Sequence, residues 1–75
     1  METTRAGGRL RAFRKLKGHT QQSFANQMHM SVSVIGEIER GTRRAEDEFL
    51  EQACALLGIT TEELLGKDHN ENEVR

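Results

Sequence analysis

The 75-residue sequence lacks proline, has a single cysteine and contains no long apolar run. With one cysteine, no disulfide can form within the chain, which fits a reducing compartment such as the cytoplasm. No stretch approaches the roughly 20 apolar residues that a membrane helix needs, and the N-terminal stretch has no apolar segment of signal-peptide length. We therefore expect a cytoplasmic protein of one small domain, without a membrane partner.

No set of residues has the spacing of a catalytic or metal site. The sequence has no phosphate loop, no nucleophile–base pair and no metal-ligand spacing. His19, His29 and His69 are widely separated, and too few cysteines lie near them for a metal site. We predict that the protein is not an enzyme and that it needs no metal, cofactor or small-molecule ligand.

The charge is unevenly distributed, although the net formal charge is only −1. Residues 1–44 hold nine Lys or Arg against three acids, a balance of +6, whereas residues 45–75 hold two against nine, a balance of −7. Such asymmetry points to an anionic partner for the first half. Charge alone leaves open the alternative that both halves are simply solvated helices.

Since proline is absent, glycine marks the breaks between the predicted helices. After an N-terminal arm over residues 1–7, a first helix over about 7–17 is predicted from apolar residues three apart, namely Leu10, Phe13 and Leu16. Gly18 ends this helix. Thr20 suits the N-cap of a second helix over 21–28, because its hydroxyl can accept a free backbone N–H.

Residues 31–40 begin with an alternation typical of a strand, but a helix explains the whole segment better. Val34, Ile35 and Ile38 share one helical face, and the opposite face is mostly polar. That opposite face consists of Ser33, Gly36, Glu37 and Arg40. Ser31 can cap this third helix at its start.

Two further helices are predicted over residues 45–57 and 60–65. The first has acids in its opening turn, where they complement the helix dipole, and then a broad apolar face. Thr60 and Glu63 have the spacing of a capping box at the start of the second. Both helices lie in the acidic half of the chain.

The predicted fold is all-α, a compact five-helix domain over residues 8–66 followed by a disordered polar tail over 67–75. Cys54 is expected to be a small core residue. The second and third helices, joined by a short turn, form a helix-turn-helix unit over about 20–40. In such a unit the first helix braces against the DNA backbone while the second offers side chains to the major groove.

The run TQQSFANQMHMSVSVIGEIERG resembles the Xre-type helix-turn-helix of phage repressors and Cro proteins. The matching features are Thr20-Gln21, Phe24-Ala25, the cap Ser31, and the closing pattern Ile35-x-x-Ile38-Glu39-Arg40-Gly41. The flanking stretches RLRAFRKLKG and ACALLGITTEELL match the first and last helices of that family. The resemblance covers about residues 8–65 and implies a repressor-like DNA-binding domain.

The resemblance implies DNA contacts for two groups of residues. Those expected to face base edges are Val32, Ser33, Gly36 and Glu37. Those expected to contact backbone phosphates are Gln21, Arg40, Thr42, Arg43 and Arg44. Gly36 would let DNA approach closely, and Glu37 could accept a hydrogen bond from cytosine N4.

Two structural features are also implied. Arg14 and Glu39 match a pair that forms a salt bridge between the first and third helices of relatives, with a role in orientation rather than net stability. His29 stands where the family usually has Gly, so a positive φ is expected there.

Sequence and resemblance together predict a sequence-specific transcriptional regulator that binds double-stranded DNA. One helix reads only a few base pairs, so we expect a homodimer on a palindromic, two-fold operator. The expected dimer interface consists of Ile59, Leu64 and Leu65. The alternative is a protein-interaction module on the same fold, such as an antitoxin or anti-repressor. Glu37 and the acidity of the chain favour it, whereas Arg43 and Arg44 disfavour it.

Overall fold

Five helices make up residues 3–66, the part of the chain that the structure, a computed structural model, describes. Their bounds are Thr3–Leu16 (α1), Gln21–Met28 (α2), Val32–Arg40 (α3), Asp47–Leu57 (α4) and Thr61–Leu65 (α5). The predicted all-α class is confirmed, and the strand alternative for the third segment is wrong. None of the helices within this range is long and apolar enough to cross a membrane. The tail predicted over 67–75 lies outside the described residues.

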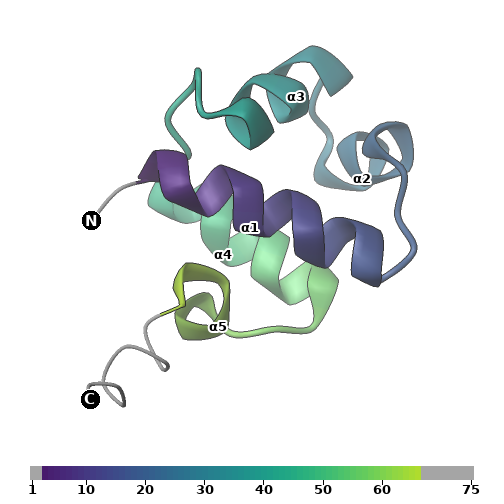
Figure 1. Ribbon diagram of the computed structural model, residues 1–75. Coiled ribbons are helices and arrows are strands. Elements are labelled where there is room, and N and C mark those ends of the chain that lie inside the picture. The colour runs from purple at the N-terminus through teal and green to yellow at the C-terminus, as the bar shows by residue number, and fades with distance from the viewer. Residues whose placement is uncertain (1–2, 67–75) are drawn as a thin grey trace, which may run out of the picture.

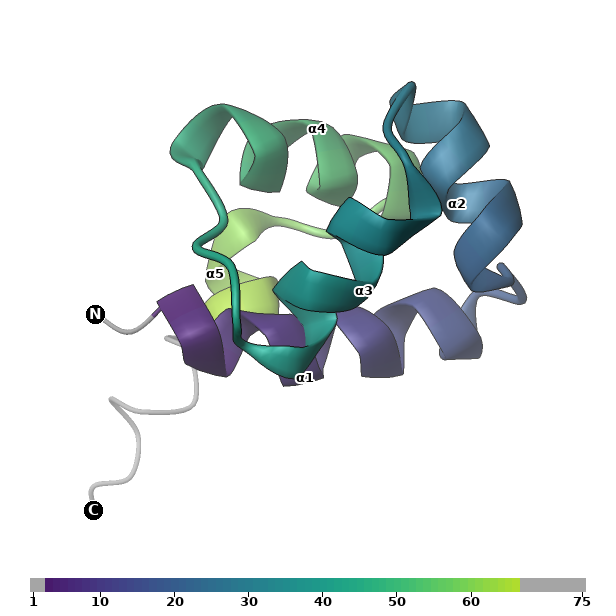
Figure 2. The same ribbon diagram turned by 90° about the horizontal axis from the view of Figure 1, so that it is seen from above.

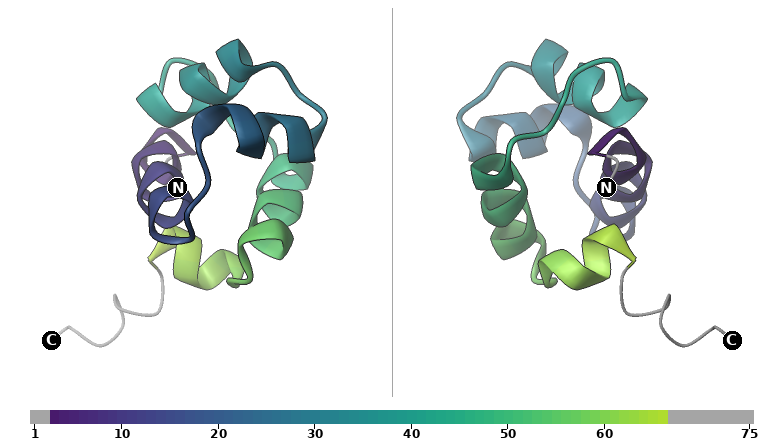
Figure 3. Two further views of the ribbon diagram at one scale, coloured as in Figure 1. Left: turned by 90° about the vertical axis from the view of Figure 1, so that its right-hand side faces the viewer. Right: turned by 90° about the vertical axis from the view of Figure 1, so that its left-hand side faces the viewer.

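The helices surround one apolar core. In Figure 1, α1 crosses the view with α4 behind it, α2 and α3 above and α5 below. Seen end-on in Figure 3, α1 and α4 lie on opposite sides, and the other three helices close the ring. The largest fully buried side chains, Phe24, Leu10, Ile35 and Leu64, come from four of the five helices. Burying each contributes about 1.5–3 kcal/mol, so the core ties together segments that are distant in sequence.

The helix starts follow the predicted caps. Thr20 Oγ1 accepts the N–H of Ser23 at 3.0 Å, and Ser31 Oγ accepts that of Val34 at 3.2 Å. Thr60 and Glu63 form the predicted reciprocal capping box at the start of α5. Each cap satisfies backbone donors that have no partner within the helix, which explains why the three boundaries could be located from sequence.

The end of α2 depends on a left-handed residue. His29 has φ +60° and is the one non-glycine residue with a positive φ among residues 3–66, as the resemblance implied. Its N–H donates to the Asn26 carbonyl, and that of Met30 donates to the Ala25 carbonyl at 3.0 Å. These hydrogen bonds offset part of the cost of the left-handed conformation and set the short turn into α3.

The predicted N-terminal arm over 1–7 is wrong from Thr3 onwards, because α1 begins at that residue. Ala6 is buried one helical turn before Leu10, and this burial favours extending the helix towards the N-terminus. The predicted apolar stripe of α1 is wrong at its end, since Leu16 is 75% exposed. Phe13 is only half-buried and packs at the edge of the core.

Leu64 cannot form the predicted dimer interface, because its side chain is fully buried within its own chain. The short helix α5 is held against α1 by Arg9, whose Nη2 donates to the Glu63 carbonyl at 2.8 Å and whose Nε donates to the Leu64 carbonyl. Arg9 therefore supplies partners for carbonyls at the end of α5.

Cys54 is buried on α4, as predicted for a small core residue. Burial raises the pKa of its thiol, and the negative charge of Glu63 raises it further. The thiol is therefore held in its neutral form and packs as an apolar group.

The backbones of α1 and α3 lie close together at Gly7. Figure 2 shows the C-terminal end of α3 beside the N-terminal half of α1. A Cβ added to Gly7 would lie 2.0 Å from the Ile38 carbonyl oxygen and 3.1 Å from that of Glu39. Both obstacles are backbone atoms of α3, so no side-chain movement could make room. Only glycine allows this spacing between the two helices.

Gly7→Ala is expected to destabilise the domain by about 1–3 kcal/mol, because the helices must move apart. Gly8→Ala is the matched control. A Cβ at Gly8 meets nothing within 4 Å, so this neighbouring change should leave stability unchanged or raise it by up to about 1 kcal/mol. Urea denaturation followed by circular dichroism measures both. Equal midpoints for the two variants would contradict the close approach.

Candidate nucleic-acid interface

The helix α3 divides into an inward and an outward face. Ile35 and Ile38 are buried, as the periodicity predicted. Ser33 and Arg40 are exposed, and Glu37 is half-buried on the outer side. Cap hydrogen bonds fix both ends of the helix, so the outer face is presented on a rigid element. The exposed segment after α3 continues this surface with Thr42, Arg43 and Arg44.

Two of the four predicted base-reading residues lie differently from expectation. Val32 is half-buried and packs against the core cluster, so only part of its side chain is available at the surface. Gly36 is buried. Its surroundings are the side chains of Arg40 and Gln21, which cover the space where DNA was expected to come close. Ser33 and Glu37 remain accessible.

Glu39 and Arg14 form the ion pair that the resemblance implied between α3 and α1. Arg14 Nε donates to Glu39 Oε2 at 2.7 Å and Nη2 donates to Oε1 at 3.0 Å, while the two side chains are only 6% and 1% exposed. A third donor of Arg14, Nη1, reaches the carbonyl of His19 at 2.9 Å. The bidentate geometry fixes the rotation of α3 relative to α1.

Gln21 joins this pair instead of projecting freely into solvent. Its Nε2 donates to Glu39 Oε1 at 3.1 Å, so one carboxylate connects α1, the start of α2 and α3. A hollow of about 310 Å³ lies at this junction, lined by Arg11, Gln21, Glu39 and Arg40. The first N–H groups of α2 add positive potential here, because a helix N-terminus attracts anions.

Arg11 is a member of this surface that the site prediction missed. It is exposed and lies three residues before Arg14, which places both on one side of α1. The spacing between Arg11 and Arg14 in the sequence could have identified Arg11 as part of this surface, because Arg14 was already expected to pair with Glu39. Two arginines, Arg11 and Arg40, therefore meet beside Gln21 from different helices.

Gly36 makes room for this arrangement. A Cβ at this position would lie 3.1 Å from Arg40 Nη1 and 3.7 Å from Gln21 Nε2. The absence of a side chain lets the Arg40 guanidinium fold back over α3, one turn from its own Cα. These contacts indicate that Gly36 makes room for the Arg40 side chain, and they do not support close approach of a DNA base at Gly36.

Glu37 and Arg43 form a second, exposed ion pair. Arg43 Nε donates to Glu37 Oε1 at 2.8 Å, and the side chains are 51% and 38% exposed. The Glu37 carboxylate thus carries its own counter-charge. Arg44 is exposed next to it.

Comparison with known proteins agrees with this geometry. The sequence pattern of a helix-turn-helix domain family matches residues 5–65. YazB of Bacillus subtilis (strain 168), an uncharacterised transcriptional regulator of the helix-turn-helix type, is 48% identical over 64 residues, spanning 85% of this chain and 93% of that protein. The restriction-modification controller protein C.AhdI of Aeromonas hydrophila is similar in structure, with TM-score 0.76 and 31% identity over 83% of this chain and 94% of that one. The chain belongs to the Xre-like helix-turn-helix family.

A second solved structure widens the set of similar regulators. The clp gene regulator ClgR of Corynebacterium glutamicum superposes with TM-score 0.83 and 27% identity, over 100% of this chain and 97% of that one. The relatives are transcriptional regulators, a non-enzymatic class, and this Xre-like protein is accordingly a DNA-binding transcriptional regulator.

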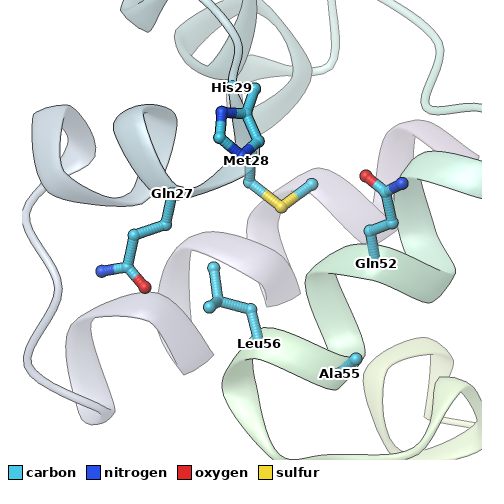
Figure 4. Close-up of a pocket in the computed structure, with 6 residues that line it drawn as sticks. All are labelled: Gln27, Met28, His29, Gln52, Ala55 and Leu56. Carbon is cyan, nitrogen blue, oxygen red and sulfur yellow. The ribbon is translucent and has the colours of Figure 1, made fainter.

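A separate groove lies between α2 and α4 of this Xre-like domain. It has a volume of about 440 Å³ and is lined by Gln27, Met28, His29, Gln52, Ala55 and Leu56. In Figure 4, Met28 and Leu56 reach into the space between the two helices, and the glutamines lie at its rim. No residue predicted to contact DNA lines it.

Loss of charge at Glu39 should be far more costly than the same change at Glu37. Glu39→Gln leaves Arg14 buried without its counter-ion, and we expect a loss of about 3–5 kcal/mol of unfolding free energy. Glu37→Gln, the matched control on the same helix, breaks only the exposed pair and should cost less than about 1 kcal/mol. Urea unfolding of both variants measures the difference. Similar losses would contradict the assignment of Arg14–Glu39 as the structural pair.

Gly36→Ala should stabilise the fold. Its new Cβ meets the far end of the exposed Arg40 side chain, which can move, and α3 gains about 1 kcal/mol of helix propensity. For a domain of this size that corresponds to a rise of about 4–8 °C in Tm. Gly41→Ala is the contrasting variant and should lower Tm, because Gly41 has φ +83°. A lower Tm for Gly36→Ala would mean that Arg40 is held rigidly in place.

Proposed function

We propose that this regulator binds a specific double-stranded DNA operator, with the outer face of α3 in the major groove. The observation that carries the proposal is the arrangement of cations around that face. Arg11 and Arg40 meet at the hollow beside Gln21, and Arg43 and Arg44 follow the end of α3. A reading helix bordered by phosphate-binding groups is the arrangement that helix-turn-helix recognition requires.

The contacts divide into two kinds. One group is proposed to contact phosphates and to set the position of the domain on the duplex. This group consists of Gln21, Arg11, Arg40, Thr42 and Arg44. The start of α2 supports this, since Gln21 is its first residue and a helix N-terminus favours a nearby anion. Ser33 and the exposed part of Val32 are proposed to contact base edges, and Glu37 lies on the same face with its ion-pair partner Arg43.

The functional unit is proposed to be a homodimer on a two-fold operator. One short helix reads too few base pairs for high specificity, and two half-sites one helical turn apart multiply it. Ile59 and Leu65 are only partly buried and remain candidates for the interface, whereas Leu64 does not. Leu16 is a further candidate, since it is 75% exposed.

A random-site selection with the purified chain tests the proposal. We expect enrichment of inverted half-sites whose centres lie about 10 bp apart. With three phosphate-contacting arginines on each protomer, log K should fall with log salt with a slope of about −5 for a dimer. No enrichment, together with a salt slope near zero, would instead support the protein-interaction module.

Arg11→Ala tests one of the proposed phosphate contacts. We expect about tenfold weaker binding on all sequences and a shallower salt slope, because a charged phosphate contact is lost. Lys17→Ala is the matched control, since it removes one exposed charge from the same region and does not line the hollow. Fluorescence anisotropy at several salt concentrations compares the two. Equal effects would show that Arg11 contributes only to net charge.

A further inference from the structure

The segment after α3 is held by hydrogen bonds to a single residue, Glu37. The Glu37 carbonyl accepts the N–H of Thr42 at 2.9 Å and of Arg43 at 3.3 Å. The Thr42 hydroxyl donates to the same oxygen at 3.2 Å. Gly41, with φ +83°, allows the chain to turn sharply enough for these hydrogen bonds. The backbone at Arg43 is therefore fixed relative to the outer face of α3.

The side chain of Arg43 is fixed by the same residue. Its Nε donates to Glu37 Oε1 at 2.8 Å, although both side chains are substantially exposed. An exposed arginine ordinarily samples many rotamers, and ordering it on binding has an entropic cost. Glu37 removes part of that cost before any ligand arrives, which is preorganisation.

The hydrogen bond through Nε leaves the other end of the guanidinium free. Within residues 6–66, Arg43 makes no side-chain hydrogen bond other than that to Glu37. The two terminal nitrogens keep four N–H groups in one plane. A parallel pair of such donors matches the O6 and N7 acceptors of guanine in the major groove.

We infer that Glu37 and Arg43 form one base-reading unit, in which Glu37 positions Arg43 to select a guanine. The inference rests on the proposed function. It assigns the base contact to Arg43 and gives Glu37 the role of holding Arg43 through Oε1, in place of the expected hydrogen bond from cytosine to Glu37. It also explains an acid on a DNA-facing surface, since its charge is compensated within the pair.

The test compares selected binding sites for five proteins: the wild type, Arg43→Ala, Arg43→Lys, Glu37→Gln, and the double variant Glu37→Gln/Arg43→Ala. Arg44→Ala is the control, because it removes an adjacent exposed arginine without an ion pair to Glu37. Affinities are then measured on the wild-type site and on the same site with the guanine replaced by adenine. Thermal melts verify that each variant is folded.

Wild-type protein should prefer guanine at one position of each half-site by about tenfold or more. Arg43→Ala and Arg43→Lys should both lose this preference, because lysine keeps the charge but not the paired donors. Glu37→Gln should lower the preference at the same position by about fivefold. The double variant should resemble Arg43→Ala, since Glu37 acts through Arg43. Arg44→Ala should weaken binding evenly and keep the preference.

Three results would overturn the inference without overturning the proposed function. One is stronger binding of Glu37→Gln on all sequences, which would mean that Glu37 only repels phosphate. Another is a further loss of preference when Glu37→Gln is added to Arg43→Ala, which would show direct base contact by Glu37. The third is a guanine preference that persists in Arg43→Ala. Because the protein would still select a site, this result would leave the proposed function intact. A folded wild-type protein that selects no site would overturn both.

Discussion

The buried ion pair between Arg14 and Glu39 is the interaction on which the rest of the structure depends. Two charges with almost no exposure can persist only if their hydrogen bonds are satisfied, and here Glu39 accepts from both Arg14 and Gln21. This requirement fixes the rotation of α3 about its axis and holds the first turn of α2 against it. The orientation of every side chain on the outer face of α3 follows from that constraint.

The arginines show how one residue type takes different roles through packing. Arg9 binds the carbonyls at the end of α5 and Arg14 binds Glu39 in the interior, so both are structural. Arg11, between them on the same helix, lines the open hollow with Arg40. A count of positive charges in the first half of the chain therefore overstates the number available to DNA. The arginines available to DNA are those whose guanidinium groups still present donors at the surface, as Arg11, Arg40 and Arg43 do.

Two glycines contribute through the absence of a side chain, in opposite settings. Gly7 lies against backbone carbonyls of α3, so it sets how closely two helices pack. Gly36 lies under the flexible end of Arg40, so it sets where a surface charge can rest. The first is a constraint on the fold, whereas the second is a constraint on the binding face.

The sequence by itself determined the local features: the caps at Thr20, Ser31 and Thr60, the inward residues Ile35 and Ile38, and the helical state of α3. These depend on interactions within about one helical turn, which periodicity and capping patterns express directly. The resemblance added the Arg14–Glu39 pair and the left-handed His29. Only the tertiary structure decided that Leu64 is buried, that Leu16 is exposed, that Gly36 is covered and that α1 begins at Thr3. Those features depend on how segments distant in sequence pack together, and no local pattern contains that information.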